Sequence, residues 1–147
     1  MFIEKIKKLG YLVKLDTNGV NPWIIKQLID KQLIDYIAMD IKAPLDKYNL
    51  ITQIKMDTDL IKQSIDLIIS SKIDYEFRTT LVKNLHDLKD IESMAKLIEN
   101  ANLFILQKFN STNPIISNTT TFSAFSEKEM ILMQNTSQNY VKKCLIR

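Results

Sequence analysis

The stretch Ile34-Asp35-Tyr36-Ile37-Ala38-Met39-Asp40-Ile41-Lys42-Ala43-Pro44 holds an apolar run, Ile34 to Ile41, that leads into a polar cluster. Its length and its aromatic and β-branched content indicate a strand. Residues two apart on a strand point to the same side, so Asp40 and Lys42 face together where the strand ends. An unpaired charge at the rim of a buried interior is costly, and we therefore expect a protein or ligand partner for each.

Three further apolar segments end in the same way, at Asp16-Thr17-Asn18-Gly19, Glu76-Phe77-Arg78-Thr79-Thr80 and Gln107-Lys108-Phe109-Asn110. Polar residues at the ends of several strands are how an α/β protein assembles one ligand site from distant parts of its chain. The clusters carry both signs of charge and predict a zwitterionic or anionic small ligand. The alternative is internal pairing, of Asp40 with Lys42 or Arg78, in a salt-bridge network that binds nothing.

The rest of the chain alternates between apolar runs of strand length and segments with helical periodicity. Strand-like runs are Tyr11 to Leu15, Ile34 to Ile41, Tyr75 to Val82, Leu103 to Gln107 and Tyr140 to Ile146. Helical patterns begin at Pro22, with a stripe of Trp23, Ile24, Leu28 and Ile29, and cover Asp57 to Ser71, Asp87 to Asn100 and Ser126 to Asn139. Alternating strands and helices of this length predict an α/β fold with a parallel sheet.

The composition limits the possible functions but does not identify one. The chain has 147 residues, 46% hydrophobic residues and a net charge of +3, which predict one ordinary globular domain. Lys5, Lys7 and Lys8 stand beside Glu4 without interleaved aromatic residues, so we interpret them as a solvated helix face and not a nucleic-acid surface. The sequence shows no signal peptide and no membrane-spanning run, and we expect a cytoplasmic protein with no membrane partner.

Four further expectations concern local features. The Asn, Ser and Thr content of residues 110–121 predicts an exposed polar loop. Ser126 and Glu129 have the spacing of a capping box. The single cysteine, Cys144, fits a reducing compartment and is expected to be a buried side chain, and the single histidine, His86, a surface or capping residue.

The clusters, taken in order, closely resemble a known family. The matching segments are Lys14 to Gly19, Asp35 to Pro44, Tyr75 to Thr80, Leu106 to Phe109 and the terminal Cys144-Leu145-Ile146-Arg147. They are similar to radical S-adenosylmethionine activating proteins of anaerobic ribonucleoside-triphosphate reductase, which are glycyl-radical activases. The resemblance spans nearly the whole chain.

The resemblance implies a partial (β/α) barrel, residues 1–147 forming a single incomplete radical S-adenosylmethionine domain. It implies reductive cleavage of S-adenosylmethionine at a 4Fe–4S cluster, and a radical that takes hydrogen from a glycine of a partner reductase. By resemblance, Asp16 and Thr17 help to hold the methionine carboxylate, with a monovalent cation as a further candidate there. Asp40 and Lys42 contact ribose and methionine, Arg78 approaches the same cofactor and Gln107 lines the far wall. Asn18 and Gly19 form a turn that a ligand can approach closely.

The chain departs from the family in two motifs. Members carry CxxxCxxC after their first strand and a GGEP-like motif after the second, and this sequence has neither. The resemblance begins at the third strand of the family, which implies a carboxy-terminal part that lacks the first two strands. Iron–sulfur clusters are held by several cysteines at defined spacing, so no metal ligand and no catalytic residue can be assigned, and we leave open whether the chain is an enzyme.

Three hypotheses follow. The chain is the carboxy-terminal portion of a radical activase, inactive alone, as a truncated product or one half of a split protein. Alternatively it is a non-catalytic docking module that binds a missing amino-terminal segment, a partner chain or a second copy through the unpaired edge of the Tyr11 to Leu15 strand. In a third hypothesis Lys42 forms a Schiff base, which the neighbouring Asp40 disfavours.

Overall fold

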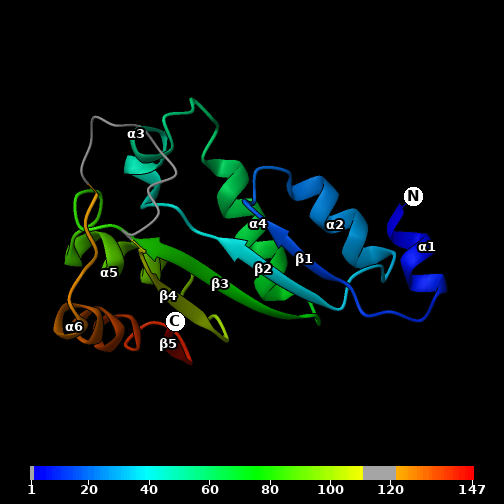
Figure 1. Ribbon diagram of the computed structural model, residues 1–147. Helices are drawn as coiled ribbons and strands as arrows, with labels where there is room; N and C mark the ends of the chain where they lie inside the picture. The colour runs from blue at the N-terminus through cyan, green and yellow to red at the C-terminus, as the bar shows by residue number, and fades with distance from the viewer. Residues whose placement is uncertain (1, 111–121) are drawn as a thin grey trace.

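The fold is known from a computed structural model that describes residues 2–110 and 122–147. All neighbouring strands pair in parallel, in the order β1-β2-β3-β4-β5. The strands are β1 (Lys14–Thr17), β2 (Tyr36–Asp40), β3 (Asp74–Leu81), β4 (Phe104–Lys108) and β5 (Cys144–Ile146). The helices are α1 (Phe2–Lys8), α2 (Pro22–Asp30), η1 (Leu45–Lys47), α3 (Tyr48–Thr52), α4 (Asp59–Ser70), α5 (Leu88–Leu97) and α6 (Glu127–Ser137). The predicted α/β fold with a parallel sheet is confirmed (Figure 1).

One face of the sheet packs against helices and forms the core. Strand residues on this face include Ile37, Met39, Phe77, Phe104 and Leu106, all fully buried. They meet the apolar stripes of four helices, which contribute Ile25 and Leu28 from α2, Ile61, Ile65 and Ile68 from α4, Ile91, Met94 and Ala95 from α5, and Met130 and Met133 from α6. Side chains alternate along a strand, so the residues between these core positions point to the opposite face.

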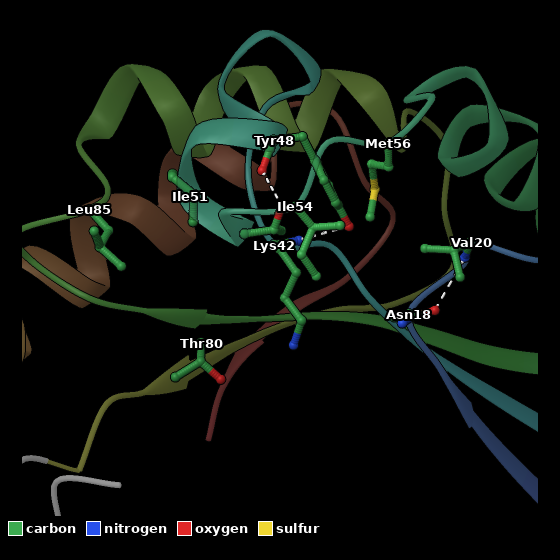
Figure 2. Close-up of a pocket in the computed structure, with 10 residues that line it drawn as sticks. Asn18, Val20, Lys42, Tyr48, Ile51, Ile54, Met56, Thr80 and Leu85 are labelled. Atoms are coloured by element: carbon green, nitrogen blue, oxygen red, sulfur yellow. Dashed lines mark hydrogen bonds between the residues drawn. The ribbon is translucent and has the colours of Figure 1, made fainter. Parts of the chain in front are cut away.

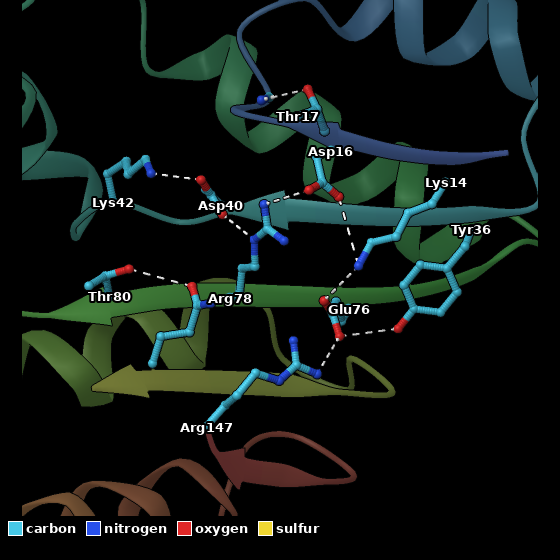
Figure 3. Close-up of polar contacts among 12 residues, drawn as sticks. Lys14, Asp16, Thr17, Tyr36, Asp40, Lys42, Glu76, Arg78, Thr80 and Arg147 are labelled. Atoms are coloured by element: carbon cyan, nitrogen blue, oxygen red, sulfur yellow. Dashed lines mark hydrogen bonds and ion pairs between the residues drawn. The ribbon is translucent and has the colours of Figure 1, made fainter. Parts of the chain in front are cut away.

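The opposite face of the sheet carries the charged residues of the strand-end clusters. Figure 3 shows them side by side, with side chains from β1, β2 and β3 reaching toward one another. Beneath them, Ala38 and Ile105 are fully buried although they do not belong to the main core. The parallel order of the strands therefore gathers the charged clusters on one face, near one end of the sheet.

Local sequence signals set where several helices begin. Pro22 opens α2, where the absent N–H of proline costs no hydrogen bond. The capping box predicted at the start of α6 is confirmed, with Ser126 and Glu129 each bonding the backbone of the other. A second capping box, formed by Asp87 and Asp90, starts α5.

Four of the five predicted strands were too long at their amino-terminal ends; the second starts at Tyr36 and not at Ile34, and the fourth at Phe104 and not at Leu103. The first starts at Lys14 and not at Tyr11, since its register with β2 runs from Lys14 opposite Tyr36 to Thr17 opposite Met39. The last starts at Cys144 and not at Tyr140, since pairing with β4 begins opposite Phe104. The expectation that the first strand lies at a sheet edge is confirmed, since among the described residues β1 pairs with β2 alone.

The predicted stripe of the first long helix is confirmed at Leu28, which is buried, and at Ile29, which is partly buried against the core, but it was wrong at Trp23 and Ile24. Trp23 is 58% exposed and Ile24 is 44% exposed, whereas α2 buries Pro22, Ile25 and Leu28. The helix begins one residue before Trp23, and positions three apart from Pro22 face the core.

Two remaining expectations concern the polar loop and the absence of a membrane-spanning segment. The predicted loop 110–121 lies, apart from Asn110, outside the described residues. Within residues 2–110 and 122–147, no helix combines the length and the apolar character that crossing a bilayer would need.

Candidate functional site

Arg78 connects the ends of three strands. Its Nε donates a hydrogen bond to Asp40 Oδ1, and its Nη2 lies 3.2 Å from Asp16 Oδ2. Asp16 is on β1, Asp40 ends β2 and Arg78 is on β3, so one guanidinium bridges two carboxylates from neighbouring strands (Figure 3). The hydrogen bond to Asp40, and then the charges of both carboxylates, hold the pKa of Arg78 above its ordinary value against the opposing effect of burial.

Lys42 completes this group from just beyond β2. Its Nζ donates to Asp40 Oδ2 over 2.7 Å, as the two-residue spacing predicted. Burial works to raise the pKa of Asp40, but the hydrogen bonds from Arg78 and Lys42 outweigh it and hold that pKa below its ordinary value. A Schiff-base lysine is normally desolvated or crowded by cations. The Lys42 ammonium is instead ion-paired, on a side chain that is 45% exposed, an arrangement that disfavours the third hypothesis.

A second charged group surrounds Glu76, which is 3% exposed. Its carboxylate accepts from Lys14 Nζ at 3.4 Å, from the Tyr36 hydroxyl at 3.3 Å and from Arg147 Nη2 at 3.4 Å. Burial, followed by the Glu76 charge, raises the pKa of Tyr36. Lys14 Nζ also lies 3.8 Å from Asp16 Oδ1, so the two groups form one continuous network across the open face.

The turn from Asp16 to Gly19 is built by its own side chains. Thr17 Oγ1 accepts from the Gly19 N–H at 3.1 Å, and Asn18 Oδ1 accepts from the Val20 N–H at 3.2 Å. Gly19 has a φ of +77°, in the left-handed region that favours glycine. Ser64 Oγ donates to the Gly19 carbonyl over 2.6 Å and ties the turn to α4. The expected strand-to-helix turn is therefore present, and it leaves the Asp16 carboxylate free to pair with Arg78.

Two neighbouring cavities open at these strand ends, each of about 350 Å³. The first is charged and is lined by Asp16, Thr17, Asn18, Asp40 and Arg78. The second is mostly apolar, with Lys42, Asn18, Thr52 and Thr80 as its polar groups, and is lined otherwise by Val20, Tyr48, Ile51, Ile54, Met56 and Leu85 (Figure 2). Asn18 lines both cavities, and Lys42 in the second pairs with Asp40 in the first. A ligand with one charged and one apolar part would match this pair.

The fold brings together most of the residues that the sequence singled out. Asp16, Thr17, Asn18, Asp40 and Arg78 share the charged cavity, and Lys42 adjoins it. Gln107 lies beside Thr80, whose Oγ1 is 3.4 Å from Gln107 Oε1, but lines neither of the two cavities. The internal salt bridges of the alternative interpretation are also present, since Asp40 pairs with both Lys42 and Arg78.

Other residues of the site were not predicted. Tyr48 reaches the Lys42 N–H with its hydroxyl at 3.4 Å, and Arg147 reaches Glu76 from beyond β5. Their separations from the strand-end motifs follow no spacing rule. Of these residues, only Tyr36 could have been found from the sequence. It is two strand positions from Ala38 and four from Asp40, so alternation places it on the same face as Asp40.

The prediction for His86 was wrong, and that for Cys144 is confirmed. His86 is 5% exposed; its Nδ1 accepts from the Val82 N–H at 3.2 Å and its Nε2 bonds the Lys42 carbonyl at 3.0 Å. The β3–α5 turn folds His86 inward, which an isolated histidine in a polar segment does not reveal. Cys144 is buried, and this burial raises the pKa of its thiol to about 11.

The donor set does not fit an iron–sulfur cluster. Across the described ranges, histidine, cysteine and carboxylate side chains form no group of three or more that could hold a metal ion. Cys144, the one cysteine of the sequence, faces the core on β5, and a protonated, buried thiol is a poor ligand.

Comparison with known proteins gives two relatives from Methanocaldococcus jannaschii. The chain is 32% identical over 145 residues to a protein named as glycyl-radical enzyme activating enzyme MJ1227, a match to 96% of this chain. It is 29% identical over 102 residues to a protein named as glycyl-radical enzyme activating enzyme MJ1632, a match to 67% of this chain. The chain spans 60% of the length of the first and 38% of the second. No family model matches the sequence.

A solved structure shares the fold. A domain of pyruvate-formate lyase-activating enzyme from Bacteroides vulgatus superposes with a TM-score of 0.73, covering 99% of this chain and 87% of that one at 15% sequence identity. The chain thus shares the α/β fold of that domain.

Proposed function

We propose that the strand-end cavities bind S-adenosylmethionine and that the chain contributes this site to a glycyl-radical activase. The observation that carries the proposal is the bridge of Arg78 to Asp16 and Asp40, with Lys42 beside it, at the mouths of a charged and an apolar cavity. The similarity to proteins named as activating enzymes supports the same assignment.

A zwitterionic ligand can enter this network without leaving charges unpaired. S-adenosylmethionine has a carboxylate, an ammonium, ribose hydroxyls and a sulfonium. Its carboxylate can replace a carboxylate of the protein against Arg78 or Lys42, and its ammonium can replace a cation against Asp16 or Asp40. Each ion pair that opens is then matched by one that forms, so the desolvation cost of buried charge is limited. The internal salt bridges are therefore compatible with binding.

The apolar cavity suits the adenine ring of the same ligand. It begins where the charged cavity ends, at Asn18 and Lys42, and its walls include Val20, Ile54 and Met56. An aromatic ring gains from such walls, and the hydroxyl groups of Thr52 and Thr80 provide polar contacts at the edge. We assign Asp40 and Lys42 to the boundary between the two parts, where a ribose would lie.

Bound S-adenosylmethionine would supply the sulfonium whose carbon–sulfur bond is cleaved reductively in radical enzymes. The chain's own residues bind and orient it; the described residues provide no ligand set for a cluster, and we derive no step through one. We propose that the target is a glycyl-radical enzyme, more specifically an anaerobic ribonucleoside-triphosphate reductase. We also propose that the chain is inactive without a cysteine-bearing partner or segment.

Equilibrium dialysis with S-adenosylmethionine tests the binding site. The wild-type chain should bind one equivalent, and Asp40→Asn should weaken binding about tenfold because it removes the negative charge between Arg78 and Lys42 and replaces one of the two acceptor oxygens by an NH2 donor. Asp30→Asn is the matched control, since it breaks an exposed Asp–Lys pair on α2 away from the cavities. Absence of saturable binding by the wild-type chain would refute the proposal, as would equal losses in the two variants.

A docking role is a second candidate, supported by the exposed β1 edge. Within the described part of the chain β1 pairs only with β2, and the segment that precedes β1 exposes Phe2, Leu9, Tyr11 and Leu12, the last at 84%. An unpaired edge invites a strand from another chain. We propose an extended segment of a partner polypeptide, or of a second copy, as the occupant. Light scattering of the purified chain should detect association, and a stable monomer at high concentration would count against the self-association form.

A further inference from the structure

Lys42 stands at the first position beyond the β2–β3 ladder. The last backbone bond of the ladder joins the Ile41 N–H to the Arg78 carbonyl at 2.8 Å. Among the described residues, the Lys42 N–H and carbonyl make no hydrogen bond to another backbone group, yet the neighbours Ile41 and Ala43 are fully buried. A buried peptide group needs hydrogen-bond partners from elsewhere.

Two buried side chains supply those partners. The hydroxyl of Tyr48, a residue that is 1% exposed, accepts from the Lys42 N–H at 3.4 Å, as Figure 2 shows. His86 Nε2 bonds the Lys42 carbonyl oxygen at 3.0 Å. The two side chains come from α3 and from the β3–α5 turn, on either side of the Lys42 backbone.

The role of each atom follows from its partner. The Val82 N–H can only donate, so His86 Nδ1 must accept, and the Nε2 of the neutral ring then carries the hydrogen that it donates to Lys42. A second contact joins the segment after Lys42 to the first turn of α5, since Lys47 Nζ lies 2.7 Å from Asp90 Oδ1. The segment from Lys42 to Tyr48 is thereby fixed to the β3–α5 turn.

We propose that Tyr48 and His86 are positioning residues that hold the Lys42 peptide from both sides and so set where its ammonium lies. This inference rests on the proposed function of the site. Lys42 lines the apolar cavity and pairs with Asp40 in the charged one. A shift of the Lys42 backbone therefore moves its ammonium group, which lies at the boundary between the two cavities. A flexible lysine on a fixed backbone loses less conformational freedom when it binds a ligand than one on a mobile backbone.

The chain offers matched variants for a test. Tyr48→Phe removes only the hydroxyl that accepts from Lys42. Tyr75→Phe is its control, because the buried Tyr75 hydroxyl accepts from the Asn102 N–H at 3.2 Å, away from the cavities. At position 86, His86→Asn keeps an acceptor in the place of Nδ1, whereas His86→Gln keeps a donor near the place of Nε2 and tests rescue by the conservative variant.

Two readouts separate positioning from folding. Amide hydrogen exchange followed by NMR, without ligand, should show faster exchange at Lys42 in Tyr48→Phe and unchanged exchange there in Tyr75→Phe. Affinity for S-adenosylmethionine should fall about fivefold in Tyr48→Phe and in His86→Asn, and stay near the wild-type value in Tyr75→Phe and His86→Gln.

The outcomes are distinguishable. Wild-type exchange at Lys42 in Tyr48→Phe would overturn the inference, and so would unchanged affinity in both Tyr48→Phe and His86→Asn when the wild-type chain binds. If the wild-type chain binds no S-adenosylmethionine, the proposed function fails, and the exchange rates at Lys42 alone then decide whether the two side chains hold its backbone.

Discussion

Arg78 and Asp40 are register partners on neighbouring parallel strands, and Arg78 Nε donates a hydrogen bond to Asp40 Oδ1 across that pair. The same guanidinium reaches Asp16 on the next strand, so three strand ends are joined through a single side chain. The pairing explains why the sheet tolerates charges on a face above buried Ala38 and Ile105. It also makes the stability of the fold sensitive to the ionisation of Asp40.

The stability of the chain should depend on pH through Asp40. Its folded-state pKa lies below the ordinary value of 3.8, so the carboxylate favours the folded state above pH 3.8, and this contribution is lost as the pH falls through the lower folded-state pKa. Asp40→Asn should cost about 2 kcal/mol at pH 7 and lose less further stability below pH 3.8. Urea unfolding across this range measures both effects. A variant curve parallel to that of the wild type would contradict the assignment.

Gly19 should tolerate a side chain less well than Gly10. Both have positive φ, of +77° and +83°, but a Cβ on Gly19 would lie 2.0 Å from Met39 Cε, whereas a Cβ on Gly10 would meet nothing within 4 Å. Gly10→Ala should therefore cost about 1 kcal/mol for the backbone alone. Gly19→Ala should cost at least about 2 kcal/mol, because fully buried Met39 must also move. Thermal or urea unfolding measures the difference in stability between the two variants. Equal losses of stability would show that the Met39 side chain moves aside without a free-energy cost.

Thr79→Val should stabilise the chain. Thr79 Oγ1 is buried and, within the described part of the chain, has no hydrogen-bond partner. Replacing the hydroxyl by a methyl group of similar size removes the desolvation penalty and should raise the free energy of unfolding by about 1 kcal/mol. Thr79→Ser, which keeps the hydroxyl and removes the methyl group, is the control and should destabilise. Loss of stability in Thr79→Val would indicate that the hydroxyl has a partner in solution.

Cys144 should react slowly with thiol reagents in the native chain. Burial raises the pKa of its thiol to about 11, so very little thiolate is present at pH 8. Labelling with iodoacetamide at pH 8 should be slow for the folded chain and fast in denaturant. Rapid labelling of the folded chain would show that the β4–β5 edge opens, and would weaken the argument that this residue is a poor metal ligand.

The parts of the fold that the sequence predicted are those governed by local pattern. Alternation placed Asp40 with Lys42 and Glu76 with Arg78 on one face, and the capping box located the start of α6. Strand limits were less predictable, because β1 and β5 extend only as far as a neighbour offers backbone partners. The inward position of His86 depends on contacts that are distant in sequence, with the Lys42 carbonyl among them.

The site was predicted through its charged residues and not through its apolar half. Strand-end charges are visible because they interrupt apolar runs. The walls of the second cavity, such as Ile51, Ile54 and Met56, come from the α3 segment and from the chain that follows it, where their spacing resembles ordinary core or surface positions. Sequence alone therefore indicated a zwitterionic or anionic ligand and gave no evidence for an adjoining apolar pocket.

The most direct test of the central claim is a titration of the isotopically labelled chain with S-adenosylmethionine, followed by amide chemical shifts. The account predicts saturable shifts that map to the Asp16–Gly19 turn, to Asp40 through Lys42 and to Arg78 through Thr80, with smaller shifts in Asp40→Asn at the same ligand concentration. S-adenosylmethionine that leaves these amides unmoved up to millimolar concentration, or that shifts amides on another face of the molecule, would contradict it.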